Sequence, residues 1–214
     1  ADEWRFRVLR AATAVRRGGV VLYPTEGVWG LGCDPRQPVA ARRLMMLKRR
    51  DEGKGLILLA AHAQATRPWE QRDMRRWARA TAPLAGRSVR RAALSSGEPR
   101  FALMPPLSTA ADDRATTWLR PTGACTAPEL RGRHRTIAIR VTRYGPTRAL
   151  CRAAGGVLTS TSANVSGAIT VPLRRWAVLR RFGPRVDAIV GLPLGGQSRP
   201  SRIFDTVSQQ WIRH

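Results

Sequence analysis

Hydrophobic and polar positions switch between helical and strand-like spacing along the first part of the chain. In residues 3–17, apolar side chains recur on one helical face, which predicts a helix that ends at a pair of glycines. Residues 20–23 form a short apolar run that is typical of a buried strand. Helical spacing returns over 39–50, and a second apolar run occupies 53–61. The order helix, strand, helix, strand predicts an α/β sheet covered by helices.

The second half of the chain continues this alternation. Residues 135–142 (RTIAIRVT) predict a strand that places Ile137, Ile139 and Val141 on one face and Arg140 on the other. Residues 66–135 otherwise show weak periodicity. The remaining expected elements are helices over 146–154 and 173–183 and strands over 115–119, 156–159, 188–190 and 201–207.

Two polar or glycine-rich segments follow predicted strands. Residues 28–35 (VWGLGCDP) are interpreted as a glycine-rich turn, and they are preceded by Thr25, whose hydroxyl would touch a small polar substrate or simply form a turn. Residues 160–167 (STSANVSG) are interpreted as a loop at a strand end, where open α/β sheets place ligands. Its hydroxyls and Asn164 would bind phosphate, ribose or a magnesium-bound water; the alternative is an ordinary turn that caps a helix.

The charge of the chain points to an anionic partner or substrate. Over 214 residues it has 38 Lys and Arg against 14 Asp and Glu, a net charge of +24. The basic residues lie between apolar stretches throughout, which predicts a folded domain rather than a basic tail. Only Lys48 and Lys54 are lysines, and both fall in one basic cluster.

That cluster is a candidate phosphate site. Cations at Lys48, Arg50 and Lys54 would converge on phosphate oxygens, with arginine supplying a fork and lysine a compact charge. The alternative is a solvated helix end. Neither a GxxxxGK[ST] loop nor a GxGxxG turn between strand and helix is present.

Several classes of protein are disfavoured. Apolar runs are shorter than the roughly 20 residues of a membrane helix, and the N-terminal residues lack a signal-like apolar segment, so we expect a cytoplasmic protein without a membrane partner. Cys33, Cys125 and Cys151 are widely spaced and are expected to be reduced thiols. The three histidines show no metal-ligand spacing, and no metal site is assigned to protein side chains.

Five ordered blocks together resemble the YrdC-like family of threonylcarbamoyl-AMP synthases, in particular its bacterial single-domain branch. The resemblance covers the first 60 residues and most of the chain after residue 115. The blocks are YPTEGVWGLGCDP (23–35), LKRRDEGKGLILLAA (47–61), RTIAIRVT (135–142), LTSTSANVSG (158–167) and GGQSRPSRIFD (195–205).

The resemblance implies an ATP-dependent transferase acting in tRNA modification. Such an enzyme is a nucleotidyltransferase that condenses L-threonine, bicarbonate and ATP, with Mg²⁺, into threonylcarbamoyl-adenylate and pyrophosphate. The product passes to other tRNA-modification proteins that make threonylcarbamoyladenosine. Family members have been linked to double-stranded RNA, so tRNA or double-stranded RNA is an expected partner. The implied fold is a single-domain, open, twisted mixed α/β sheet with flanking helices and a concave basic cavity over residues 1–214.

The resemblance also implies roles for individual residues. The family's KxR and SxN elements fall on Lys48, Arg50, Ser162 and Asn164, which are expected to be catalytic. Thr25 and Arg140 are expected to hold threonine, Arg140 by pairing with its carboxylate. The expected ATP-binding residues are Lys54, Thr117, Ser160 and Ser201.

One block departs from the family pattern. Where the family has WPGP, this chain has Asp112, Asp113, Arg114 and Ala115, and residues 82–111 are interpreted as an insertion or a weakly constrained segment. Losing a rigid turn and gaining two carboxylates would weaken ATP binding. Two alternatives therefore stay open: a non-catalytic RNA-binding or ribosome-assembly module, and a catalytically impaired homologue.

Overall fold

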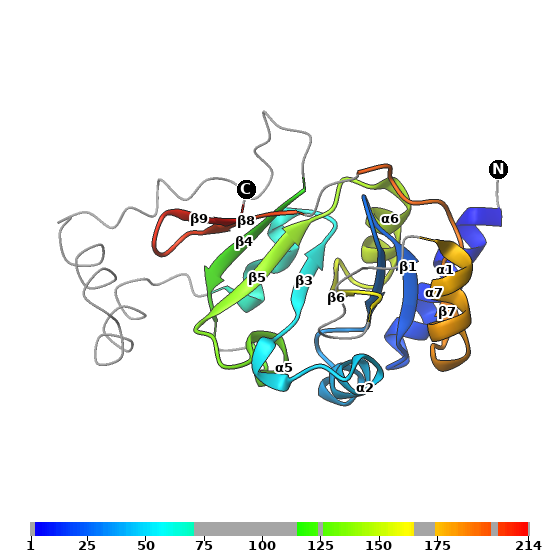
Figure 1. The fold of residues 1–214 in the computed structure, drawn as a ribbon, viewed down its shortest axis with the longest axis horizontal. Coiled ribbons are helices and arrows are strands. Elements are labelled where there is room, and N and C mark those ends of the chain that lie inside the picture. The colour runs from blue at the N-terminus through cyan, green and yellow to red at the C-terminus, as the bar shows by residue number, and fades with distance from the viewer. Residues whose placement is uncertain (1–2, 71–114, 124–125, 165–173, 198–200, 214) are drawn as a thin grey trace.

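A computed structural model of the chain describes residues 3–70, 115–123, 126–164, 174–197 and 201–213. The predicted insertion at 82–111 and the acidic residues 112–113 lie outside these ranges. Figure 1 shows one curved sheet with helices packed on both sides. The α-helices are α1 (Glu3–Arg16), α2 (Pro38–Lys48), α5 (Pro128–Arg131), α6 (Gly145–Ala153) and α7 (Arg175–Phe182), with short 3-10 helices η1 (Glu52–Lys54), η2 (Ala63–Trp69) and η5 (Gly183–Arg185).

Within the described residues the strands form a nine-stranded mixed sheet in the order β7-β1-β2-β6-β3-β5-β4-β8-β9. Strand β3 pairs with β5 in parallel and with β6 in antiparallel orientation, which is the mixed pattern expected for this fold. The strands are β1 (Val21–Pro24), β2 (Trp29–Gly32), β3 (Ile57–Ala60), β4 (Thr116–Pro121), β5 (Thr136–Val141), β6 (Val157–Ser162), β7 (Ala188–Ile189), β8 (Arg202–Asp205) and β9 (Gln210–Arg213).

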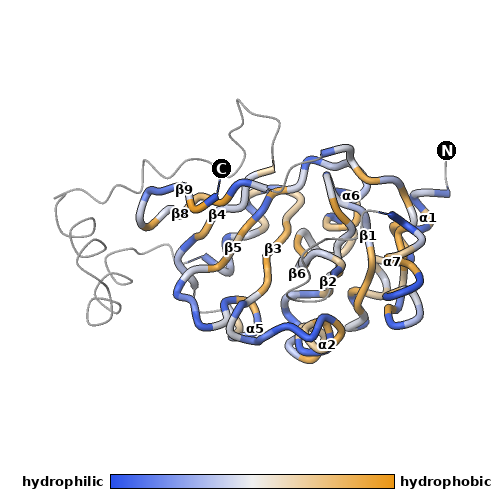
Figure 2. Tube along the Cα trace, viewed as in Figure 1, coloured by the Kyte–Doolittle hydropathy of each residue, from blue (hydrophilic) through white to orange (hydrophobic). Residues whose placement is uncertain are grey.

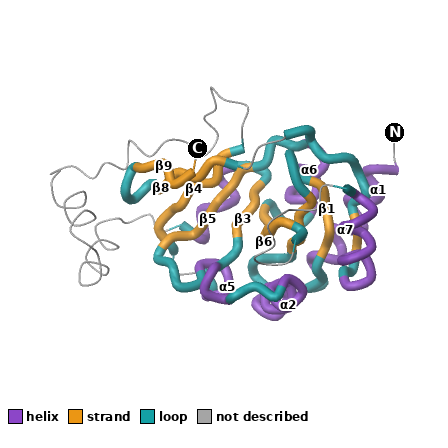
Figure 3. The backbone as a smooth tube through the Cα atoms, in the orientation of Figure 1, coloured by secondary structure: helices purple, strands orange, loops and turns teal. Residues whose placement is uncertain are grey.

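Two apolar clusters, one on each face of the sheet, form the core. One cluster joins alternate strand residues to α2, α5 and α7, through side chains such as Leu44, Leu130 and Phe182. The other joins the intervening strand residues to α1 and α6, for example Val15 and Leu150. Hydrophobic residues follow the central strands in Figure 2, and the helices flank the strands in Figure 3. Alternation along the central strands therefore buries both faces, as the sequence pattern predicts.

Most predicted elements are confirmed within a few residues, but the glycine-rich segment 28–35 is not simply a turn. Its centre is strand β2, paired with β1 and β6. A Cβ on Gly32 would lie 2.3 Å from the carbonyl oxygen of Thr159 and 3.0 Å from the ring of Tyr23. Glycine is required there because the neighbouring strand and the tyrosine ring leave no space for a side chain.

Two further predictions need correction. The segment that begins at residue 160 is not loop from its start, because β6 continues to Ser162 and buries Ser160 and Thr161. Beyond the predicted strand 201–207, the chain turns and returns as β9, which was not predicted because its residues are exposed and carry no alternating pattern. Both stretches are held in the sheet by backbone pairing, which side-chain periodicity does not report.

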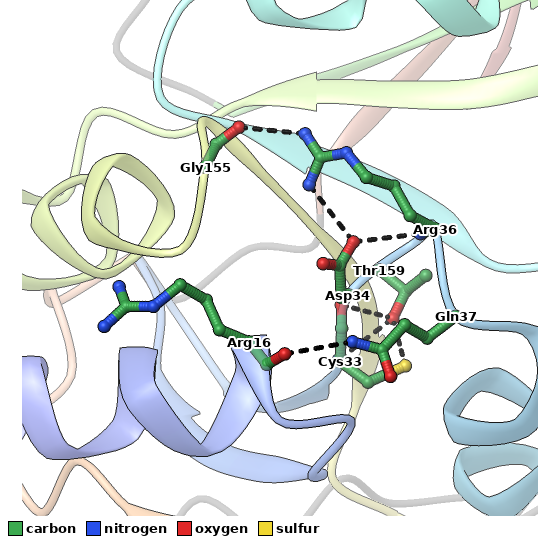
Figure 4. Close-up of polar contacts among 7 residues, drawn as sticks. All are labelled: Arg16, Cys33, Asp34, Arg36, Gln37, Gly155 and Thr159. Atoms are coloured by element: carbon green, nitrogen blue, oxygen red, sulfur yellow. Dashed lines mark hydrogen bonds and ion pairs between the residues drawn. The ribbon is translucent and has the colours of Figure 1, made fainter.

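The end of the β2–β6 pair away from Ser162 is fixed by a compact polar network (Figure 4). The Thr159 hydroxyl accepts a hydrogen bond from the backbone N–H of Cys33 at 3.0 Å. Arg36 pairs with Asp34 at 3.2 Å and donates to the carbonyl of Gly155 at 3.1 Å. Cys33 and Cys151 are buried free cysteines, and Cys125 lies outside the described residues. Among the described helices, none has the length and apolar character needed to span a bilayer.

Candidate active site

Helix α2 places the side chain of Lys48 in the interior of the protein. The helix begins with Pro38 in its first turn and ends at Arg49, whose backbone is left-handed with φ of 52°. Lys48 is 1% exposed although its side chain ends in an ionisable amine. Its Nζ donates to the carbonyl oxygen of Ser162 and, at 3.2 Å, to Oδ1 of Asn164. The structure thus brings three of the four predicted catalytic residues into contact. These three residues, Lys48, Ser162 and Asn164, are called the Lys48 cluster below.

The environment of Lys48 changes its ionisation. Burial, reinforced by the charge of Arg50, lowers the pKa of Lys48 to about 7. Its two acceptors are a carbonyl and an amide oxygen, and neither carries the full negative charge that would restore an ordinary lysine pKa. An anion placed beside Lys48 would favour the protonated form.

Arg50 lies close enough to Lys48 for their charges to interact, and it contacts the backbone of Lys54. Arg50 donates from Nε to the carbonyl of Gly55 at 2.9 Å and from a terminal nitrogen to the carbonyl of Lys54 at 3.2 Å. These bonds tie the end of α2 to the turn before β3. Burial lowers the pKa of Arg50, although nearby Asp51 opposes this effect. Lys54 itself is exposed on η1.

Thr25 closes the turn between β1 and β2. Its hydroxyl donates to the carbonyl oxygen of Val28 at 2.7 Å. Two backbone contacts lay the segment before residue 198 over this turn: Gly195 N–H to Thr25 O at 2.9 Å and Gln197 N–H to Glu26 O at 2.8 Å. The N–H of Ala163 donates to Trp29 O at 2.7 Å, so Asn164 follows directly beside the same turn.

Beyond Thr25 lies a buried pair of opposite charges. Glu26 is 7% exposed and Arg140, on β5, is 9% exposed. Oε1 of Glu26 accepts from the Thr142 hydroxyl at 2.6 Å and from the N–H of Arg143 at 3.1 Å. Burial alone would raise the pKa of Glu26, but the charge of Arg140 and these hydrogen bonds bring it below its ordinary value. The sequence analysis gave Glu26 no role; its only signal was an acid directly after Thr25 in a strongly basic chain.

Thr117, on β4, meets Ser201, which directly precedes the neighbouring strand β8. Their hydroxyl oxygens are 3.2 Å apart, and Arg213 on β9 donates to Ser201 Oγ at 3.1 Å. Burial and then the charge of Arg140 lower the pKa of Arg213. Arg140 therefore interacts electrostatically both with Glu26, beside Thr25, and with Arg213, which contacts Ser201.

Ser160 is placed differently from the other candidates. Its hydroxyl accepts a hydrogen bond from the Tyr23 hydroxyl at 2.7 Å, and both residues are buried in the core face that packs on α1 and α6. Burial raises the pKa of Tyr23 well above its usual range. The structure gives Ser160 a contact within the core and does not place it in the Lys48 cluster.

A cavity of about 370 Å³ lies between α2 and the α7–η5 segment. Arg43 in its lining is paired with Asp187 at 2.6 Å. Met46, also in the lining, is 71% exposed. None of the predicted site residues lines this cavity, which is bordered by Arg43, Met46, Leu47, Arg49, Arg181 and Arg185.

Mg²⁺ has few possible protein ligands in this part of the molecule. Within the described ranges no group of three or more His, Cys, Asp or Glu side chains gathers as a metal site. The Ser162 hydroxyl and the Asn164 amide lie together here, and neutral oxygen groups of this kind suit the water shell of a hydrated divalent cation.

Known proteins share this fold and much of this sequence. Residues 13–90 and 103–214 match the sequence profile of the Sua5–YciO–YrdC family, described as "Telomere recombination". The chain is 42% identical over 209 residues to a threonylcarbamoyl-AMP synthase of Halorhodospira halophila, covering 97% of this chain and 94% of that protein. It is 41% identical over 210 residues to the enzyme of that name from Methylococcus capsulatus, covering 97% of each.

Solved structures agree on the fold. Escherichia coli YciO superposes with a TM-score of 0.66 at 19% identity, over 99% of this chain and 92% of YciO. Pyrococcus abyssi Sua5, solved with L-threonine, gives a TM-score of 0.66 at 20% identity; it matches 94% of this chain, which spans only 51% of that Sua5. The fold and site define an α/β protein with cations and hydroxyls gathered around a strand-to-strand turn. The chain belongs to the Sua5–YciO–YrdC family.

Proposed function

We propose that the protein is an enzyme that forms threonylcarbamoyl-adenylate from L-threonine, bicarbonate and ATP, releasing pyrophosphate, for the threonylcarbamoyladenosine modification of tRNA. The observation that carries this proposal is the contact of Lys48 with Ser162 and Asn164, because it assembles the residues that match the family's KxR and SxN elements. Relatives that share more than a third of the sequence carry the name threonylcarbamoyl-AMP synthase.

The proposed chemistry has two bond-forming steps. The threonine amine first joins bicarbonate, with loss of water, to give a carbamate. A carbamate oxygen then attacks the α-phosphorus of ATP, and the bond to the β,γ-pyrophosphate breaks, which makes the protein a nucleotidyltransferase. Neither step needs a covalent enzyme intermediate, so positioning and charge stabilisation supply the catalysis.

In this proposal each group of residues has a separate task. Lys48 and Arg50 stabilise negative charge on the triphosphate, with Lys54 at the exposed rim. Ser162 and Asn164 bind the phosphates or the water shell of the accompanying Mg²⁺, which screens phosphate charge when bound. Thr117 and Ser201 contact the nucleotide, and Arg140 pairs with the threonine carboxylate beside the turn at Thr25.

The test is the release of pyrophosphate by the full chain. We expect release to require ATP, threonine and bicarbonate together, and to fall by at least about 100-fold in Lys48→Ala, the range seen when one charge-stabilising donor is lost. Full activity of Lys48→Ala would overturn the assignment of Lys48. Folded protein without turnover would favour the impaired homologue instead.

An RNA partner is a second proposal, favoured by the arginine-lined cavity. Arg49, Arg181 and Arg185 line this cavity. The fourth arginine of the lining, Arg43, is paired with Asp187. Like charges repel, and a phosphate backbone would relieve that repulsion. We propose that tRNA or double-stranded RNA contacts this surface through its phosphates.

A further inference from the structure

The buried charges of Glu26 and Arg140 are incompletely satisfied within the described part of the chain. Oε2 of Glu26 and Nε of Arg140 are both buried and have no hydrogen-bond partner there. No hydrogen bond or ion pair joins the two side chains to each other, although they interact through space. A buried ionic group without a partner is costly, and such groups in native structures usually have a ligand or a functional reason.

The remaining contacts of Glu26 hold its carboxylate in place. Oε1 accepts hydrogen bonds from the Thr142 hydroxyl and the Arg143 N–H, and the backbone carbonyl of Glu26 accepts one from the N–H of Gln197. A Cβ on the next residue, Gly27, would lie 2.4 Å from the carbonyl oxygen of Gln197, so the turn packs tightly under that segment. One carboxylate oxygen, Oε1, accepts both of these side-chain hydrogen bonds, and Oε2 accepts none within the described residues.

Glu26 and Arg140 carry opposite charges, and each has a buried polar atom without a partner in the described residues. Such a pair of side chains is suited to bind the two oppositely charged ends of an amino acid. An α-amino acid carries a carboxylate and an ammonium group separated by one carbon. A guanidinium binds the carboxylate through paired N–H donors, and a carboxylate accepts N–H bonds from the nitrogen. An amine that has lost a proton still has N–H groups to donate, so this contact can persist while its lone pair attacks carbon.

We propose that Glu26 is a binding and specificity residue for the amino-acid substrate: its Oε2 accepts a hydrogen bond from the α-nitrogen of threonine while Arg140 holds the α-carboxylate. This rests on the proposed function and adds to it the group that orients the reacting nitrogen. The site selects α-amino acids over hydroxy acids that carry the same carboxylate and side chain.

The test compares two ligands and two proteins by titration calorimetry in the presence of ATP. The ligands are L-threonine and its deamino analogue, which keeps the carboxylate and the hydroxyl. The proteins are the unaltered full chain and Glu26→Gln, which keeps the Oε1 acceptor for Thr142 but removes the negative charge. We expect unaltered protein to bind threonine at least about 10-fold more tightly than the analogue, the range of a hydrogen bond to a charged group.

In Glu26→Gln, threonine affinity should fall by a similar factor, whereas affinity for ATP and for the analogue should not fall. Equal affinity of the unaltered protein for threonine and the analogue would overturn the proposal without any variant. Undiminished threonine affinity in folded Glu26→Gln would also overturn it. Absence of any threonine binding by the unaltered protein would instead contradict the proposed function itself.

Discussion

The Nζ of Lys48 and the Oδ1 of Asn164 lie 3.2 Å apart, joined across 116 residues of sequence. The same Oδ1 accepts a second hydrogen bond from the Ser162 hydroxyl at 2.6 Å. With its oxygen occupied twice, the amide of Asn164 is fixed in orientation, and its NH₂ group is left to donate elsewhere. Under the proposed function, Lys48 would therefore act on a bound phosphate both through its own charge and by orienting an amide donor.

Replacing Asn164 by Asp tests that orientation. The substitution keeps the size of the side chain but puts a charged oxygen where the NH₂ group was. We expect ATP affinity to fall by at least about 10-fold, because a donor becomes an anion beside the triphosphate. Direct titration with ATP measures this, and the exposed Gln64→Glu provides the same chemical change away from the site. Equal ATP affinity in both variants would refute the role of Asn164.

The lowered pKa of Lys48 predicts that ATP binding is linked to proton uptake. At pH 8 a group with a pKa of about 7 is mostly neutral, so a nearby triphosphate should raise that pKa and draw a proton onto Nζ. We expect up to about one proton to be taken up per ATP bound, measured by calorimetry in buffers of different ionisation enthalpy. Lys48→Met should abolish the uptake, and Lys54→Met, the same change at an exposed lysine, should preserve it. Uptake retained in Lys48→Met would contradict the assignment.

The same group makes stability depend on pH. Its folded-state pKa is about 7 against an ordinary 10.5, so between these values the unfolded chain binds more protons. The contribution of Lys48 to the free energy of unfolding should therefore rise with pH over this window and stay flat below it. Denaturant titrations at several pH values should show that slope in the unaltered protein and a smaller slope in Lys48→Met. An identical slope in both proteins would place the Lys48 pKa outside this window.

Gly32 provides a test of the fold. Its alanine variant would press a methyl group against the Thr159 carbonyl and the Tyr23 ring. We expect the free energy of unfolding to fall by about 1–3 kcal/mol, the range for overpacking a core. Gly145→Ala is the matched control, because its Cβ would meet no atom within 4 Å. Thermal or denaturant unfolding measures both, and equal stability of the two variants would contradict this packing.

Sequence periodicity located most of the elements because burial on both faces imposes regular spacing on strands and helices. It failed at 28–35 because glycine signals both turns and close packing, and only the Tyr23 ring and the neighbouring strand distinguish the two. It also missed β9, whose exposed residues carry no pattern.

The resemblance located Lys48, Ser162 and Asn164 by their motifs, yet their contact depends on pairing between distant segments. The chain pattern alone did not reveal Glu26, because an unpartnered carboxylate oxygen is a property of packing. The concave basic cavity and the catalytic and binding roles of all the predicted site residues stay predictions.

The arginine-lined cavity makes a separate prediction about RNA. The double variant Arg181→Glu, Arg185→Glu should weaken binding of double-stranded RNA by at least about 10-fold and flatten its dependence on salt, since fewer phosphates are neutralised. Pyrophosphate release should not change, because these residues lie outside the Lys48 cluster. Gel-shift titrations over a salt series measure the effect, with Arg5→Glu, Arg10→Glu on the exposed face of α1 as the control. Equal losses in both double variants would show that only total charge matters.

The central measurement is whether carbon from bicarbonate enters an adenylate made by this chain. The full-length protein is incubated with ATP, Mg²⁺, L-threonine and ¹³C-bicarbonate, and the products are analysed by mass spectrometry. We predict a threonylcarbamoyl-adenylate that carries the label, formed together with pyrophosphate and absent when threonine is omitted. Folded protein that binds ATP and threonine but forms no labelled adenylate would contradict the proposed function.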